Sequence, residues 1–217
     1  MKKLIAVVSL VVLGLSLTAM AADHRNMVRT EPKAGTAYKA PIEATAPVYN
    51  NLDVAYPKGV YYPDSGWYIV GAKNTYGIPN FAEGEQFTLS AAATVSKVVT
   101  GVNYAASGTY TDFWVAIEAD SSGVPSGTPI AKTKITVDSQ TFGACCAVES
   151  KHLSASLAAG TYWIVWYTDK NSDLVAEVNV SIQDMVDSQN FAYSESNGAA
   201  GTWTAYTDIF GMAAELK

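Results

Sequence analysis

TYWIVWYT (residues 161–168), DKNSD (169–173) and LVAEVNVSI (174–182) together form the clearest β-hairpin signal in the chain. Side chains alternate between the two faces of a strand, so 161–168 places large apolar residues on both faces, as is typical of a central strand. In 174–182, apolar residues at every second position alternate with Val, Glu, Asn and Ser, which predicts one buried and one wet face. The intervening Asp, Asn and Ser residues favour a turn.

Similar short apolar runs recur from Val48 onward, separated by clusters of Gly, Ser, Asn, Asp and Pro, and no window sustains a helical stripe over three turns. In Ile130–Val137, Ala131 and Ile135 should face inward while Lys132 and Lys134 face outward. Many short strands at hairpin spacing predict an all-β fold, a β-sandwich resembling a jelly roll. We expect further strands near residues 67–70, 86–89, 95–104, 110–119, 147–157, 191–194 and 209–213.

The first residues have the pattern of an export signal. Lys2 and Lys3 precede an uncharged apolar run from Leu4 to Leu17, and Ala19-Met20-Ala21 offers the small residues that signal peptidase reads. We therefore predict a signal peptide at 1–21, and a mature protein that is secreted, periplasmic or extracellular. The apolar run is too short for a stable anchor and no second run follows, so no membrane span is expected after cleavage.

The mature chain divides into a linker and a domain. Residues 22–47 show no hydrophobic period, hold few large apolar side chains and contain Pro32, Pro41 and Pro47, which predicts an extended linker. Residues 48–217 then form the predicted β-sandwich domain.

The charge balance narrows the range of partners. The chain has 14 Lys and Arg residues against 20 Asp and Glu residues, and loss of Lys2 and Lys3 with the signal peptide changes the net charge from −6 to −8. Such a surface repels nucleic acids and anionic lipids, so neither is expected to bind.

Cys145 and Cys146 are the only cysteines, and they are adjacent. Neighbouring α-carbons lie about 3.8 Å apart across a trans peptide, closer than the roughly 4.4–6.8 Å of an ordinary disulfide. A bond between them would therefore close a strained ring that stiffens a loop, or form an apolar knob facing a sugar beside Phe142. Because export favours oxidation, we expect this vicinal disulfide, with free thiols and an intermolecular bridge as alternatives.

Trp114 is the first candidate for ligand binding, because it shares a predicted strand face with Asp112 and Glu118. An aromatic ring flanked by carboxylates can stack on a pyranose and hydrogen-bond its hydroxyls. The alternative is that Trp114 packs under a neighbouring loop or between the sheets.

A calcium loop is suggested by Asp169, Asn171 and Asp173, but Leu174 stands where the sharp-turn Gly is needed and no acidic closing ligand follows. We interpret the segment as a solvated hairpin turn, and expect no metal or other cofactor.

Catalytic motifs are missing. His24 lies in the linker, His152 has no Gly-x-Ser-x-Gly elbow or zinc-type spacing to work with, and no Gly-rich phosphate loop precedes a helix. A glycosidase needs only two carboxylates, but nothing singles out a pair among the 20 acids. We expect a module that is not an enzyme, with a secreted glycan-active hydrolase as the alternative.

Five segments, taken in order, resemble the exported bacterial β-sandwich domains called choice-of-anchor domains: VYNNL at 48–52, QFT at 86–88, DSSGVPSG at 120–127, CC at 145–146 and AGTYWI at 159–164. The resemblance implies a non-catalytic binding or scaffolding module of the cell surface or extracellular space, and supplies no catalytic residues. An extracellular glycan or an envelope component is the expected partner.

The final residues depart from the choice-of-anchor pattern. FGMAAELK at 210–217 lacks the hydrophobic stretch and basic stop of a C-terminal anchor, which favours free secretion or periplasmic residence. A further alternative is a structural subunit of a surface assembly, in which residues 22–47 add an edge strand to a neighbour.

Overall fold

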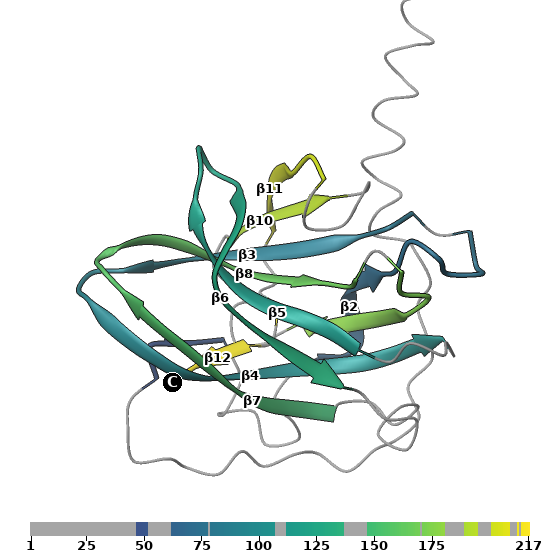
Figure 1. The fold of residues 1–217 in the computed structure, drawn as a ribbon, viewed down its shortest axis with the longest axis horizontal. Helices are drawn as coiled ribbons and strands as arrows, with labels where there is room; N and C mark the ends of the chain where they lie inside the picture. Colours follow the sequence, from purple (N-terminus) through teal and green to yellow (C-terminus); the bar gives the residue numbers. More distant parts are fainter. Residues whose placement is uncertain are drawn as a thin grey trace, which may run out of the picture. The chain divides into compact units, whose positions relative to one another are not determined.

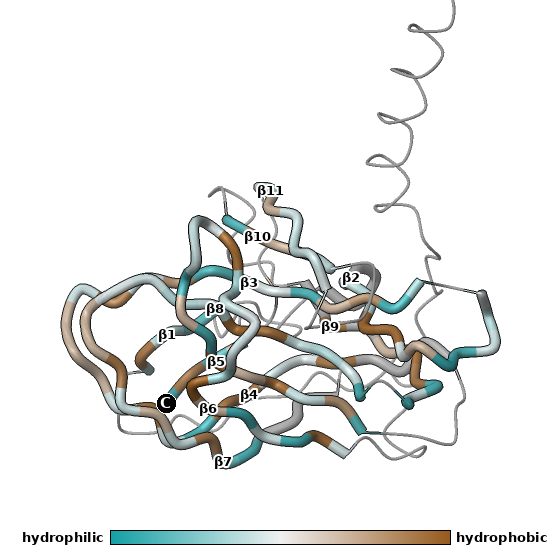
Figure 2. The backbone as a smooth tube through the Cα atoms, turned by 45° about the horizontal axis from the view of Figure 1, so that its top comes forward, coloured by the Kyte–Doolittle hydropathy of each residue, from teal (hydrophilic) through white to brown (hydrophobic). Residues whose placement is uncertain are grey.

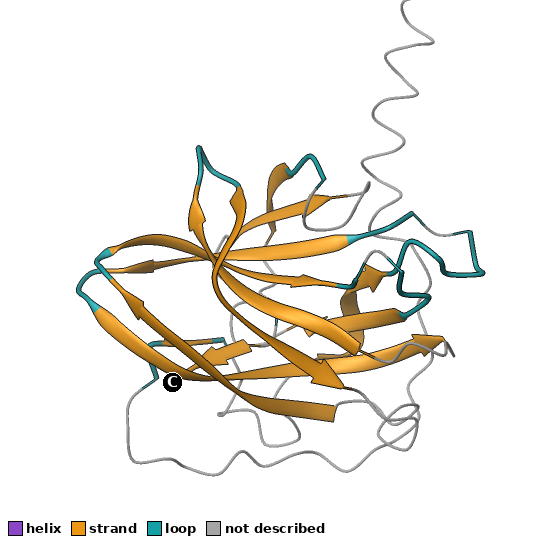
Figure 3. Cartoon of the chain, viewed as in Figure 1, coloured by secondary structure: helices purple, strands orange, loops and turns teal. Residues whose placement is uncertain are grey.

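The computed structural model describes residues 47–51, 62–77, 79–106, 112–136, 147–169, 171–180, 189–194, 201–208, 212 and 214–217. All of them belong to one compact unit, Pro32–Lys217. Their regular structure is strand throughout (Figure 3). The predicted signal peptide, the linker except Pro47, and both cysteines lie outside the described residues. No helix with the length and hydrophobicity of a membrane span occurs among the described residues.

The strands follow one another along the chain with short connections between most of them. They are β1 (Tyr49–Asn50), β2 (Tyr62–Val70), β3 (Ala82–Leu89), β4 (Ala93–Ala106), β5 (Asp112–Asp120), β6 (Pro125–Thr136), β7 (Ala147–Leu157), β8 (Gly160–Tyr167), β9 (Val175–Val180), β10 (Gln189–Ser194), β11 (Thr204–Asp208) and β12 (Ala214–Leu216).

Two antiparallel sheets, each of six strands, share these elements (Figure 1). Sheet A has the order β1-β12-β4-β9-β2, with β7 also paired to β4, and sheet B has the order β11-β10-β3-β8-β5-β6. The eight consecutive strands β2 to β9 thus divide into β2-β9-β4-β7 and β3-β8-β5-β6. This is the strand order of a jelly roll built from two Greek keys, so the predicted fold class is confirmed.

The main core lies between the inner faces of the two sheets. Along the strands, hydrophobic residues alternate with polar ones, as the brown and paler segments of Figure 2 show. Apolar side chains at every second position of each strand meet there, among them Ile69, Val98, Val102, Val178, Phe87, Phe113, Val115, Ile117, Ile164 and Trp166. Burial of these side chains is the main stabilising contribution to the fold.

The central position predicted for residues 161–168 is confirmed, because β8 lies between β3 and β5. Ile164 and Trp166 belong to the main core, whereas Trp163 and Val165 belong to a second cluster on the other face of sheet B. A strand that is apolar on both faces has to be covered on both.

One detail of the predicted strands is corrected. Val175, expected on the wet face of β9, is buried, because it pairs with Val70, which is also buried. The strand expected at 209–213 lies outside the described residues except for Met212, so it stays a prediction.

Glu85 of β3 is a buried carboxylate inside the sandwich. Its Oε1 accepts hydrogen bonds from Tyr49 Oη at 2.5 Å and Asn51 Nδ2 at 2.8 Å, and its Oε2 accepts one from the Met212 backbone N–H at 2.7 Å. These three hydrogen bonds replace the hydration that the Glu85 carboxylate loses on burial. They also tie β1 and the segment before β12 to the opposite sheet.

Candidate functional site

The outer face of sheet B, the side away from the main core, is organised in rows that run across the strands. The middle row consists of small or β-branched residues in register, Ala116, Val165, Gly84, Ala192 and Ala205. Beside it runs a row of larger and more polar residues, Glu118, Trp163, Gln86, Asn190 and Thr207. Because the side chains of the middle row are short, they leave space above the sheet that another part of the chain can fill.

The tip of the β5–β6 hairpin is a tight turn. Ser122 and Gly123 have positive φ angles of 59° and 86°, and the Ser121 N–H donates to the Val124 carbonyl at 2.8 Å. Two consecutive positive φ angles are the mark of a type I′ hairpin turn. Register shifts on both sides of Glu118 add twist just before the tip. In Figure 1 the twisted hairpin end stands beside β10 and β11.

This hairpin tip covers the middle of the outer face. Val124 packs against the second cluster, whose buried members are Ala116, Trp163, Val165 and Ala192. A Cβ atom on Gly84 would lie only 3.2 Å from Pro125 Cγ, so the absence of a side chain at Gly84 lets the hairpin approach closely. Toward β10 and β11, Asn190, Ala205 and Thr207 remain exposed on this face.

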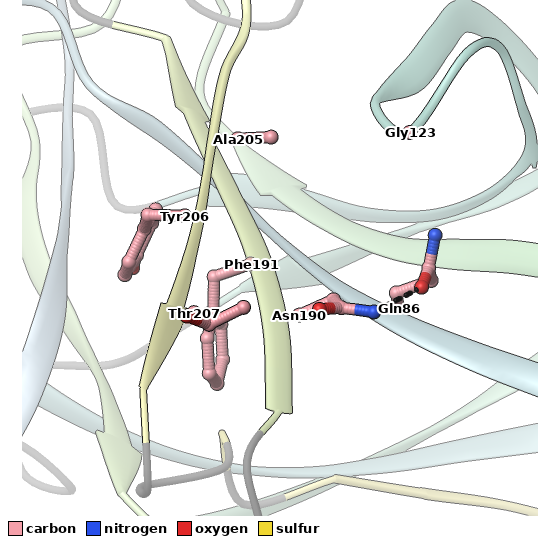
Figure 4. Close-up of a pocket in the computed structure, with 7 residues that line it drawn as sticks. All are labelled: Gln86, Gly123, Asn190, Phe191, Ala205, Tyr206 and Thr207. Carbon is pink, nitrogen blue, oxygen red and sulfur yellow. Dashed lines mark hydrogen bonds between the residues drawn. The ribbon is translucent and has the colours of Figure 1, made fainter.

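A groove of about 340 Å³ lies there, between the hairpin tip and the last strands of sheet B. In Figure 4, Gly123 on the turn stands across from the Gln86 and Asn190 side chains, with β11 beyond them. The side chains of Asn190, Ala205 and Thr207 are exposed. No carboxylate or ammonium group is among the lining residues, which are Gln86, Gly123, Asn190, Phe191, Ala205, Tyr206 and Thr207.

A chain of hydrogen bonds fixes the floor and wall of the groove. Asp120 Oδ1 accepts from Trp163 Nε1 at 2.8 Å and from Gln86 Nε2 at 2.9 Å, and Asp120 Oδ2 accepts from the Gly123 N–H at 3.1 Å. Gln86 Oε1 in turn accepts from Asn190 Nδ2 at 2.7 Å. Because Asp120 is an acceptor only, it sets the orientation of the Gln86 amide, which sets that of Asn190. The polar groups of the groove are therefore preorganised.

The predicted site residue Trp114 lies elsewhere on the same sheet and is half-buried. Its Nε1 donates to Asp169 Oδ1 at 2.9 Å, and the Lys132 Nζ lies 4.7 Å from the ring centroid. One face of the ring is thus occupied by a cation–π contact. A sugar could stack on that face only by displacing Lys132.

Neither predicted carboxylate partner of Trp114 is open to a ligand in the expected way. Asp112 forms a 2.7 Å ion pair with Lys134. Partial burial alone would raise the pKa of Asp112, but the hydrogen bonds from Lys134 and Thr136 and the Lys134 charge outweigh it and lower that pKa. Glu118 is buried, so the expectation that it hydrogen-bonds a surface sugar is not supported.

Glu118 instead secures the start of β6. Its Oε2 accepts from the Gly127 N–H at 2.6 Å, and burial raises the pKa of Glu118 despite this bond and a second one from the Thr128 backbone. Burial, together with the negative charges of Glu118 and Asp169, also raises the pKa of Tyr167 to about 12.

The hairpin predicted across 169–173 is wrong, because this segment connects β8 of sheet B to β9 of sheet A and the two strands do not pair. The Ser172 N–H donates to the Asp169 carbonyl at 2.8 Å, Asn171 is exposed and Asp173 is half-buried. Within the described part of the chain, no group of three or more His, Cys, Asp or Glu residues could hold a metal ion. Cys145 and Cys146 lie outside the described residues, so the disulfide stays a prediction.

The residues that form the groove were missed by the sequence reasoning. Gln86 of β3 lies far along the chain from Asn190 of β10 and Thr207 of β11, and no binding motif links the three residues. Polar residues at alternate positions of β10 and β11 indicate a polar strand face. The sequence does not reveal that this face lies beside Gln86, because that depends on the order of the strands in the sheet.

No protein-family model, curated protein or solved structure matches this chain.

Proposed function

We propose that this chain is an exported, non-catalytic module that binds a neutral carbohydrate of the extracellular space or envelope in the groove on sheet B. The observation that carries the proposal is the Gln86–Asn190 amide pair, joined at 2.7 Å and anchored on Asp120. Each amide combines donors with an acceptor, which is the pattern that sugar hydroxyls require. Preorganised polar groups bind with a smaller loss of conformational entropy.

The remaining lining supports a neutral ligand. Thr207 adds a hydroxyl, and among the residues that the structure describes, none with an ionised side chain lines the groove to select a charged ligand. The volume of about 340 Å³ falls within the range of small-molecule sites.

The same features favour binding over hydrolysis. A glycosidase places two carboxylates on either side of the bond that it cleaves. The groove lining contains none, and Asp120 behind it already accepts three hydrogen bonds. Export and a surface role rest on the signal peptide predicted at 1–21 and on the resemblance to choice-of-anchor domains. The assembly alternative rests on residues 22–47, of which only Pro47 is described.

Affinity electrophoresis of the mature chain in gels containing xylan, galactomannan or mixed-linkage β-glucan tests the proposal. We expect at least one polysaccharide to retard the wild type, and Asn190→Ala to abolish the retardation. Asn171→Ala is the matched control, because Asn171 is an exposed Asn in the 169–173 turn. Wild-type migration unaffected by all three polysaccharides, or an Asn190→Ala variant that is still retarded, would contradict the proposal.

A further inference from the structure

We infer that the groove continues along β11 to Trp203, and that the ligand is an oligosaccharide of at least two rings, one of which stacks on the Trp203 indole. This inference rests on the proposed function, since it extends the same groove. It assigns the stacking role expected of Trp114 to a different tryptophan.

The alternation of β11 places Trp203 next to the groove. Thr207 and Ala205 line it, and Trp203 follows at the next alternate position, directly before the strand begins. Two residues of strand advance the chain by about 6.8 Å. Trp203 also packs against the second cluster, which contains Ala192, the register partner of Ala205, and this puts it on the outer face of sheet B. A sugar chain over Asn190 and Ala205 would therefore meet the indole with its next unit.

The surface that Trp203 presents is carbon. The residue is half-buried, but its Nε1 is buried and has no hydrogen-bond partner among the described residues. Because Nε1 is the only polar atom of the indole, any exposed part of the ring is apolar, which is what the C–H face of a pyranose stacks on. A buried N–H without a partner is unfavourable, so a plain apolar ring would serve packing alone better.

The other two tryptophans on the outer face of sheet B, Trp163 and Trp114, are not available for a sugar to stack on in the same way. Trp163 is fully buried and donates to Asp120, and Trp114 donates to Asp169 under the Lys132 ammonium. Trp203 is the one with an exposed apolar surface that extends the groove.

The indole and the amide pair are held in one rigid unit. Trp203 and Val124 both pack against the cluster that contains Trp163, and Trp163 shares its acceptor Asp120 with Gln86. Stacking and hydrogen bonding are therefore preorganised relative to each other, which favours a ligand long enough to use both.

The test measures affinity against chain length by isothermal titration calorimetry, with xylo-, manno- and cello-oligosaccharides of one to six units. We expect the wild-type affinity to rise about tenfold or more once the second or third ring is added. Trp203→Ala should lose this rise, Trp203→Tyr should keep most of it, and Asn190→Ala should lose binding at every length. Trp114→Phe is the matched control and should bind as the wild type does.

The outcomes separate the two proposals. If Asn190→Ala abolishes binding while Trp203→Ala keeps the full dependence on length, the Trp203 inference is overturned and the proposed function stands. If neither substitution affects binding, or nothing binds, both are overturned.

A second measurement avoids substitutions that weaken packing. The bound hexasaccharide should protect the wild-type tryptophan fluorescence from acrylamide quenching, and this protection should be reduced in Trp203→Tyr. Protection that is equal in the two proteins overturns the inference, whatever the melting temperature of Trp203→Ala.

Discussion

The Tyr49 hydroxyl donates a 2.5 Å hydrogen bond to the buried Glu85 carboxylate, joining the short β1 of sheet A to β3 of sheet B. Two further donors, Asn51 Nδ2 and the Met212 N–H, converge on the same carboxylate. The two chain segments that enter and leave the jelly roll are thus held by one side chain of its interior.

Removal of this carboxylate should be strongly destabilising. Glu85→Ala leaves three donors without their acceptor, at about 1–3 kcal/mol for each buried group. We expect the free energy of unfolding to fall by more than about 3 kcal/mol, measured by urea denaturation. Tyr49→Phe removes one donor and should cost about 1 kcal/mol. A Glu85→Ala variant as stable as Tyr49→Phe would show that the donors find other partners.

The raised pKa of Glu118 predicts the direction in which folding stability changes with pH. Burial raises its pKa above 4.5 in the folded state, so the folded protein binds the proton more tightly than the unfolded chain. Stability should therefore decrease as the pH rises from 4.5 through the raised pKa. Glu118→Gln should remove this part of the slope in urea unfolding between about pH 4.5 and 7. An unchanged slope would contradict the assignment.

Asp112 should have the opposite effect on the pH dependence of stability, and it serves as the control for Glu118. Its pKa is lowered from 3.8, so the stability that it contributes is present above 3.8 and lost as the pH falls through the lowered value. Asp112→Asn should change the slope of stability against pH only in this acid limb, and lower the stability by a constant amount above it. Because the Asp112–Lys134 pair lies near the surface, the change should be small and should shrink in high salt.

The type I′ turn predicts a cost for a side chain at Gly123. Gly123 has a φ of +86°, and Gly123→Ala places a Cβ in a left-handed conformation, although there is open space around it. We expect a loss of about 1–2 kcal/mol. Gly160→Ala is the control, because its Cβ would make only ordinary contacts with Tyr162 at 3.6 Å. Equal melting temperatures for the two variants would argue against the turn.

We predict that Trp114 contributes to folding stability and not to polysaccharide binding. Trp114→Phe keeps an aromatic ring under Lys132 but loses the 2.9 Å bond to Asp169. We expect a loss of about 1.5 kcal/mol with unchanged polysaccharide retardation. Retardation that disappears in a folded Trp114→Phe protein would restore the sugar site first expected at this tryptophan.

Much of the architecture could be predicted because apolar alternation depends on local sequence. β7 begins and ends where residues 147–157 were expected, and the inward Ile135 and outward Lys132 and Lys134 of β6 are as predicted. β11 could not be predicted, because TAYTD at 204–208 has little apolar alternation. It becomes a strand by pairing with β10, a contact that local sequence does not encode.

The site was harder to predict than the fold. Asp112, Trp114 and Glu118 do share a face, but the face alone does not tell which side chains are covered. Glu118 is buried because bulges and Gly127 bring the start of β6 over it. Glu83 and Glu85 are also buried, although acidic residues favour exposure, because β3 places them on an inner face.

The pairing of β2 with β9 has a consequence for how the chain folds. Tyr62 lies opposite Val180, so sheet A cannot close until nearly the whole domain is present. Contacts between such distant positions make folding slow. A chain released before residue 175 would lack β9 and leave the edges of β2 and β4 bare, so the period between synthesis and closure is when this protein is most exposed to aggregation.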